Sequence, residues 1–558
     1  MRSMGKIQPW FIVVFASLMS FGGRVHADDS DADMSFDFDD VEATVADLTP
    51  PEKGEPTADL RAALQLYSAS RFPEAAMALQ RVVDGETGDD AGNVQLAEFT
   101  LAKTMYSMRF YQSALALFDE ITIAATGHHH FDESLQWLAQ LATQLPEPAG
   151  ITERIGRYPL ARIETFDTPE NQQLYNHLLF LMGRHLYNEG DFESAAEFFG
   201  KIGETSPFYI EGKFFEGITY IRMRRARPAV SAFRTILDSA NSSRAPVADR
   251  DRIRNLAWIS LARVYYTAAN RVDPATGDTE IDGRFLGQAI ESWNQVEESS
   301  EYWLDALFES SWAFFIANDH SRALGNIHSL NSPFFRGAYY PEADVIKAVT
   351  FFVNCQYDNA LATLGKFHDR YDPIARQLDE IFEKYRDNVA FFEFLRDVRA
   401  GHAVLPENIE GIVRSSLSDR TVLAHVAYVR VLDEESKRLQ EMPDEFQNAG
   451  VGMRILADIE IARSYAIDET GDLTRGRYRR LVDELQDLTN QIDTVELEIL
   501  TAQREGLSTE AQAAADIARE GQGEVIVDEE HQLWPFDGEY WRDELGFYRQ
   551  RVTHQCGR

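Results

Sequence analysis

One segment of the chain repeats itself and decides the fold. It runs from Leu179 to Ile236 and reads LFLMGRHLYNEGDFESAAEFFGKIGETSPFYIEGKFFEGITYIRMRRARPAVSAFRTI. Four of its residues recur 34 positions later: Gly183 as Gly217, Ala195 as Ala229, Phe199 as Phe233 and Ile202 as Ile236. A fixed period of this length is typical of helix pairs that stack on one another. The segment therefore predicts an all-α fold.

The same segment resembles the tetratricopeptide repeat family. In a helix, Leu179, Met182 and Leu186 share one face. Gly183 would let a second helix approach closely, and Ala195 would fill the narrow point of that crossing. The resemblance rests on residues at the spacing of that repeat: Leu179, Met182, Gly183, Leu186, Ala195, Phe199, Ile202 and Pro207.

Small residues at the same position extend the pattern over residues 57–373. We expect about seven to nine repeats there, some of them degenerate, in a superhelix of helix pairs. An insertion, Asn270 to Gly283, interrupts one pair. The structural repeat positions are Ala75 and Ala114 in the first pairs, then Gly183, Ala195, Phe199, Gly217, Ala229, Phe233, Ala289, Ala323 and Ala360.

The N-terminus reads as a targeting segment. Arg2 and Lys6 precede an apolar run from Trp10 to Phe21, and small residues follow near position 27. Residues 1–27 therefore predict a secretory signal peptide, and with it an exported protein, most simply a periplasmic one. Residues 28–56 are acidic and low in complexity, which predicts a disordered linker.

The repeat period is lost after Pro373, and residues 374–505 read as a C-terminal helical region. Ile374–Val398 and Thr421–Met442 are predicted to be amphipathic helices. From Tyr478 to Ala502, apolar residues recur in steps of three and four. This seam favours either a coiled-coil hairpin with the preceding helix or ordinary helical packing.

Residues 506–558 form a polar linker and an aromatic tail. The tail is predicted either to dock on the helical hairpin or to engage a partner. Its aromatic residues are Trp534, Phe536, Tyr540, Trp541, Phe547 and Tyr548.

The chain is strongly acidic, with a formal net charge of −37. Bulk charge of this sign argues against binding nucleic acid or an anionic membrane surface. No segment after the predicted signal reads as a membrane span. The two cysteines, Cys355 and Cys556, either pair with each other or remain as free thiols.

Motifs for catalysis are not found in the sequence. It lacks a Walker loop, G-x-S-x-G and H-E-x-x-H. The consecutive histidines His128–His130 cannot all face one site on a helix, and the acidic run Asp278–Gly283 lacks the glutamate that ends a calcium loop. We therefore expect no enzymatic activity, no cofactor and no metal site.

The resemblance implies a concave surface that is aromatic with a few cations. Such a surface suits a peptide segment of another protein. Trp312 is the least expected residue at its repeat position and the expected anchor. The predicted groove residues are Tyr106, Phe180, Arg184, Tyr187, Phe214, Arg263, Tyr266, Phe308, Trp312, Phe315 and Phe352.

These features predict a non-enzymatic scaffold or adaptor that binds protein partners in a bacterial envelope assembly. The alternative is a glycan- or peptidoglycan-binding accessory module, in which the aromatic groove stacks on sugar rings. The sequence leaves the oligomeric state open.

Overall fold

The structure is a computed structural model that describes residues 48–241, 250–272, 279–335, 338–513 and 539–556. The predicted signal peptide, residues 28–47 of the acidic linker, and Trp534 and Phe536 of the tail lie outside these ranges. The fold is all-α, as predicted. In the described part of the chain, one short antiparallel hairpin accompanies the helices, with β1 (Asn270–Val272) paired to β2 (Thr279–Ile281).

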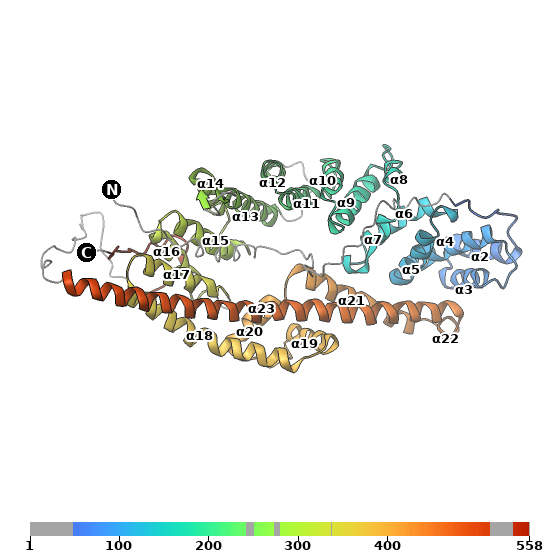
Figure 1. The fold of residues 1–558 in the computed structure, drawn as a ribbon. Coiled ribbons are helices and arrows are strands. Elements are labelled where there is room, and N and C mark those ends of the chain that lie inside the picture. The colour runs from blue at the N-terminus through green and yellow to red at the C-terminus, as the bar shows by residue number, and fades with distance from the viewer. Residues whose placement is uncertain (1–47, 242–249, 273–278, 336–337, 514–538, 557–558) are drawn as a thin grey trace, which may run out of the picture.

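The described helices between residues 58 and 384 form an arch in which successive helices are antiparallel (Figure 1). Two short 3₁₀ turns lie between its helices: η2 (Ala125–Gly127) follows α5, and η3 (Glu147–Ala149) precedes α7. The helices of the arch are α2 (Ala58–Ser68), α3 (Phe72–Val83), α4 (Ala91–Ser107), α5 (Tyr111–Ala124), α6 (Phe131–Leu141), α7 (Ile151–Gly156), α8 (Leu160–Glu164), α9 (Gln172–Asn188), α10 (Phe192–Gly200), α11 (Tyr209–Arg222), α12 (Ala226–Asn241), α13 (Arg250–Ala269), α14 (Gly283–Trp293), α15 (Trp303–Ile316), α16 (His320–Leu330), α17 (Pro341–Val353) and α18 (Tyr357–Lys384).

The turns inside six helix pairs share one backbone conformation. Each places a single residue at positive φ, a conformation that reverses the chain after a helix. Each of these residues lies five positions before the alanine at the helix crossing. They are Ser70, Arg109, Gly190, Arg224, Asn318 and Cys355, with φ between 56° and 83°. The pairs are therefore copies of one unit, which fits an α-solenoid.

Close helix approach explains the small residues of the repeat. All seven crossing alanines, from Ala75 to Ala360, have no exposed surface. A Cβ atom on Gly183 would lie 2.7 Å from the Phe199 ring, and one on Gly217 would lie 2.7 Å from the Phe233 ring. Each glycine therefore leaves space for the phenylalanine ring of the second helix in the same helix pair.

The C-terminal region differs from the prediction in where its helices break. Pro373 lies inside α18, so Ile374–Val398 is not one helix. Buried Tyr371, Ile374 and Leu378 hold α18 together across the proline. The break comes at Asp387, whose side chain caps α19 (Asn388–Ala400) by accepting from Ala390 N.

The last helix, α23 (Gly450–Ala513), has 64 residues and spans about 96 Å at 1.5 Å per residue. The segments before it are α20 (Glu407–Ser416), α21 (Arg420–Gln440) and α22 (Asp444–Gln447). The first half of α23 runs antiparallel to α21, with ion pairs Arg463–Asp433 at 2.5 Å and Arg477–Asp419 at 2.7 Å.

Of the two arrangements considered for the seam, the structure shows ordinary helical packing and not a hairpin with the preceding helix. Tyr478 is fully buried against α18 and α19, and its hydroxyl donates to the Leu378 carbonyl at 3.1 Å. Farther along, Gln503 donates to Asp358 on α18 at 3.4 Å. The seam from Tyr478 onward therefore packs on the end of the arch, and not on the preceding helix α21.

The helix α23 joins the two ends of the arch. It contacts α3 and α5 at one end, and α17, α18 and α19 at the other. The middle of the arch, from α9 to α14, lies apart from it (Figure 1). The arch and α23 together form a closed outline, because the helix runs from one end of the arch to the other (Figure 1).

The C-terminal tail docks on the last helix pairs, and not on the helical hairpin. Cys355 and Cys556 form a disulfide. Gly546 N donates to Ser329 Oγ at 2.8 Å and Gln555 N to the Asn354 carbonyl at 2.9 Å. The tail residue Leu545 is buried.

Among the described residues, no helix is both long enough and apolar enough to cross a bilayer.

The glycine contacts predict opposite effects at two positions. Gly183→Ala should lower the free energy of unfolding by roughly 1–3 kcal/mol, because the added Cβ overpacks against Phe199. In Gly365→Ala, on α18, the new Cβ meets nothing within 4 Å, so this variant should gain about 0.5–1 kcal/mol of helix propensity. Urea unfolding measures both. Equal effects of the same sign would contradict the repeat register.

Candidate functional site

A large cavity lies between the concave side of the arch and the C-terminal helices. Its volume is about 1870 Å³. Residues of α7, α9, α11 and α13 line it from the arch, and residues of α21 and α23 line it from the opposite side. We call this cavity the chamber.

Large apolar side chains of α23 face the chamber without being covered. Ile461 is 72% exposed and Tyr465 is 69% exposed, and both line the cavity. They are four residues apart, so they share one helix face. From the arch, Tyr209, Phe214 and Phe215 line the same cavity. The chamber therefore offers apolar groups on both of its walls.

The charged side chains of the chamber are held in place by partners. The Arg184 guanidinium pairs with Glu147 and lies 4.1 Å from the centre of the Phe215 ring. Arg477 pairs with Asp419 across α23 and α21. Both pairs line the chamber. Held cations of this kind recognise carboxylate or carbonyl groups with little loss of side-chain freedom.

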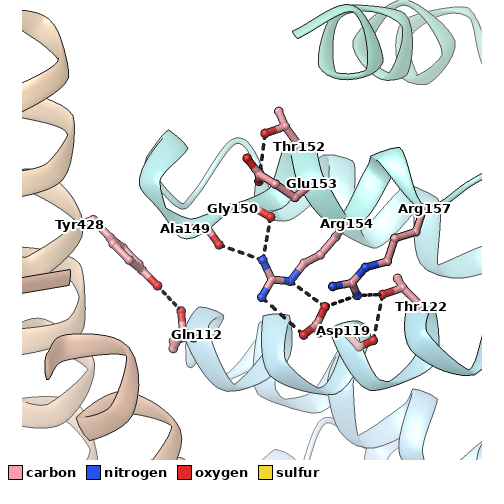
Figure 2. A network of polar contacts seen from close by, with 10 residues as sticks. All are labelled: Gln112, Asp119, Thr122, Ala149, Gly150, Thr152, Glu153, Arg154, Arg157 and Tyr428. Carbon is pink, nitrogen blue, oxygen red and sulfur yellow. Dashed lines mark hydrogen bonds and ion pairs between the residues drawn. The ribbon is translucent and has the colours of Figure 1, made fainter. Parts of the chain in front are cut away.

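A polar network fixes the end of the chamber near α5 (Figure 2). Arg154 on α7 pairs with Asp119 on α5 at 2.9 Å and donates to the Gly150 carbonyl at 2.6 Å. Arg157 reaches the same carboxylate at 2.5 Å. In Figure 2, Tyr428 of α21 points across to Gln112, and its hydroxyl donates to Gln112 Oε1 at 2.7 Å.

Side chains of α21 and α23 bind the turn between α4 and α5 and the helix α5 itself. Glu435 on α21 is 1% exposed, and its carboxylate accepts from Tyr111 N at 2.9 Å and Gln112 N at 3.2 Å. Arg438 donates to the Arg109 carbonyl at 2.7 Å, and Arg454 pairs with Glu120 at 2.6 Å. We call Tyr428, Glu435, Arg438 and Arg454 the clasp.

Three groups near the clasp and the chamber have raised pKa values, two of them because of burial. Burial raises the pKa of Glu435 to about 8, against the opposing effect of the two amides that it accepts from. It also raises the pKa of Asp458 to about 6. Burial alone would lower the pKa of His425, but hydrogen bonds to Glu469 and the Thr421 carbonyl outweigh it, so that pKa is raised.

Only part of the predicted groove lines the chamber. Arg184, Tyr187 and Phe214 do. The other predicted residues do not line it. Arg263 pairs with the nearly buried Glu309 at 2.6 Å. The remaining ones are buried or half-buried aromatic residues: Phe180, Tyr266 and Trp312 are buried, and Tyr106, Phe308, Phe315 and Phe352 are half-buried. Trp312 is 5% exposed, so it is a core residue here and not a surface anchor.

Sequence reasoning missed the wall that α21 and α23 contribute. His425, Tyr428, Ile461 and Tyr465 were not among the predicted groove residues. One signal was available: Ile461 and Tyr465 are large apolar residues with a spacing of four, upstream of the predicted seam. Their position opposite the repeats depends on contacts between distant segments.

The two sequence motifs that were considered as metal sites have other roles in the structure. His128 is buried, with Nε2 3.3 Å from Glu98, and His130 stacks on Phe99 at 4.4 Å. In the acidic run, Asp282 caps α14 by accepting from Arg284 N, while Asp278 lies outside the described residues.

A scan against protein-family models finds no match, and a search of curated proteins finds no significant match.

The buried Glu435 predicts a stability that depends on pH. The folded state holds the Glu435 proton more tightly than the unfolded chain, whose pKa is near 4.5. Stability should therefore fall as the pH rises from about 4.5 to about 8, by up to about 1.4 kcal/mol per pH unit. Glu435→Gln keeps an acceptor for the two amides and should remove this slope.

Chemical unfolding across this pH range measures the effect, with Glu434→Gln as the control on the same helix. Glu434 is 63% exposed, so the control should keep the wild-type slope. A Glu435→Gln profile that is parallel to wild type would contradict the assignment.

Proposed function

We propose that this chain is a tetratricopeptide-like scaffold or adaptor, which binds a peptide segment of a protein partner in the chamber. The proposal rests on one observation above all: two large apolar side chains, Ile461 and Tyr465, stay exposed and face an aromatic wall across a cavity. Aromatic and apolar groups in such positions are the usual anchors of an interface.

The size of the chamber supports a polymer as its ligand. Pockets for small molecules and cofactors measure about 300–1,000 Å³, and the chamber is larger at about 1870 Å³. Its walls mix apolar anchors with paired charges, as surfaces that bind peptide segments do. A peptide also presents carbonyl and carboxylate oxygens, to which Arg184 and Arg477 can donate hydrogen bonds.

A glycan ligand is less well supported by these contacts. Sugar rings stack on open aromatic faces, whereas the Phe215 ring is covered by Arg184 at 4.1 Å. The Phe214 ring lies edge to face with Phe233 and Phe215. Tyr465 is the most open ring of those that line the chamber.

The repeat family and the location belong to the same proposal. The spacing of Gly183, Ala195 and Phe199 and the shared turn conformation support a tetratricopeptide-like superhelix. The disulfide between Cys355 and Cys556 supports export, because disulfides persist in oxidising compartments such as the periplasm. The predicted signal sequence points the same way.

The test is a selection of peptides from a random display library against the full mature chain, followed by affinity measurement. Ile461→Ala and Tyr465→Ala should each weaken the selected peptides by about 10-fold or more, because buried interface anchors contribute over 1 kcal/mol. Leu497→Ala is the matched control, since Leu497 lies on the same helix with 66% exposure and does not line the chamber.

Peptides that bind all three variants with wild-type affinity would reject the chamber as the binding site. Selective binding of oligosaccharides on a glycan array, with no peptide selected, would reject the peptide proposal in favour of a glycan-binding module.

A further inference from the structure

A histidine and two carboxylates meet where α23 crosses α18, in a cluster separate from the chamber. His368 comes from α18, and Asp493 and Glu496 come from α23. One ligand atom of each lies within 4.8 Å of the other two. The cluster is half-buried at His368, so ions can reach it from solvent.

The distance between His368 and Asp493 is compatible with two ligands of one metal ion. His368 Nε2 lies 3.4 Å from Asp493 Oδ1. Two ligand atoms bound tetrahedrally to Zn²⁺ at about 2.0–2.1 Å are roughly 3.3 Å apart.

The other nitrogen of the same imidazole is also held by a carboxylate. His368 Nδ1 lies 3.3 Å from Asp372 Oδ1, one helical turn later on α18. Metal-binding histidines usually donate their second N–H to such a carboxylate, which fixes the tautomer and aims the free nitrogen at the metal. Asp372 therefore orients His368 with Nε2 toward the carboxylates of α23.

The helices that carry the cluster hold it in register. On one side of it, Tyr478 of α23 donates to the Leu378 carbonyl of α18, and on the other, Gln503 donates to Asp358. On α23, Asp493 and Glu496 are three residues apart and share one face. Ligands on two packed helices lose little freedom when a metal binds.

We propose that His368, Asp493 and Glu496 bind a divalent transition-metal ion, with Zn²⁺ as the preferred ion. One imidazole and two carboxylates are ligands that suit Zn²⁺, and three protein ligands leave a fourth position open. The bound ion joins α23 to the end of the arch. This site goes beyond the proposed peptide binding and does not depend on it.

The competing interpretation is a surface ion pair that needs no metal. Asp493 is 62% exposed, and exposed ion pairs contribute about 0–1 kcal/mol. An ion pair needs a protonated imidazole, whereas a zinc ligand needs a neutral one. The two interpretations therefore differ in their response to added Zn²⁺ and to pH.

The experiment is calorimetric titration of the full mature chain with Zn²⁺, together with thermal unfolding and with absorption spectroscopy of the Co²⁺ form. We expect one ion per chain, a melting temperature that rises with Zn²⁺, and the intense visible bands of tetrahedral Co²⁺. His368→Gln and Asp493→Asn should abolish the saturable binding, and Asp372→Asn should weaken it by about 10–100-fold.

Two controls separate this site from other histidines. His402→Gln changes an exposed histidine elsewhere and should leave binding unchanged. A variant with His129 and His130 replaced by Gln tests the consecutive histidines, and it should also bind like wild type. Absence of saturable Zn²⁺ binding by wild type, or binding by His368→Gln with wild-type affinity, would overturn the proposal.

Discussion

The architecture depends on a single constraint: one long helix must pack at both ends of a curved stack of helices. At one end, the Glu435 carboxylate of α21 accepts hydrogen bonds from the first amides of α5, and Arg454 of α23 pairs with Glu120. At the other end, Tyr478 of α23 is buried against α18 and α19. With both ends held, the middle of the arch cannot close onto α23, and the chamber lies in the space between them.

This closure has a consequence for binding. An open solenoid offers its concave face to any partner that approaches, whereas here α21 and α23 form a second wall. A segment bound in the chamber would contact Phe214 on one side and Tyr465 on the other. Contacts on two walls bury more of a peptide than one groove can, and the preformed walls reduce the ordering cost of binding.

Local features of the sequence predicted the repeat unit well. Ala195 and Ala229 are fully buried at their crossings, and Gly183 meets Phe199 as its spacing indicated. These features depend on residues within one helix pair, so their periodicity carries the information. The all-α class follows from the same periodicity.

Pairings between distant segments were less predictable. The seam from Tyr478 onward indicated that the helix has a partner but not which one, and the partner is α18. Trp312 was expected on a concave surface, yet it is buried, because the spacing of residues along one helix does not say which other segments cover them. Pro373 continues a helix because buried neighbours on both sides outweigh its missing N–H.

Hydrogen exchange at the amides of Tyr111 and Gln112 shows whether α21 and α23 close the arch in solution. The first amides of a helix have no partner within the helix. Protection at these two positions therefore reports that their hydrogen bonds to Glu435 are formed. If Glu435 is in place, both amides should be protected about as well as the interior of α5, and far better than Tyr357 and Asp358 at the start of α18. Exchange at Tyr111 and Gln112 as fast as at Tyr357 and Asp358 would contradict this closure.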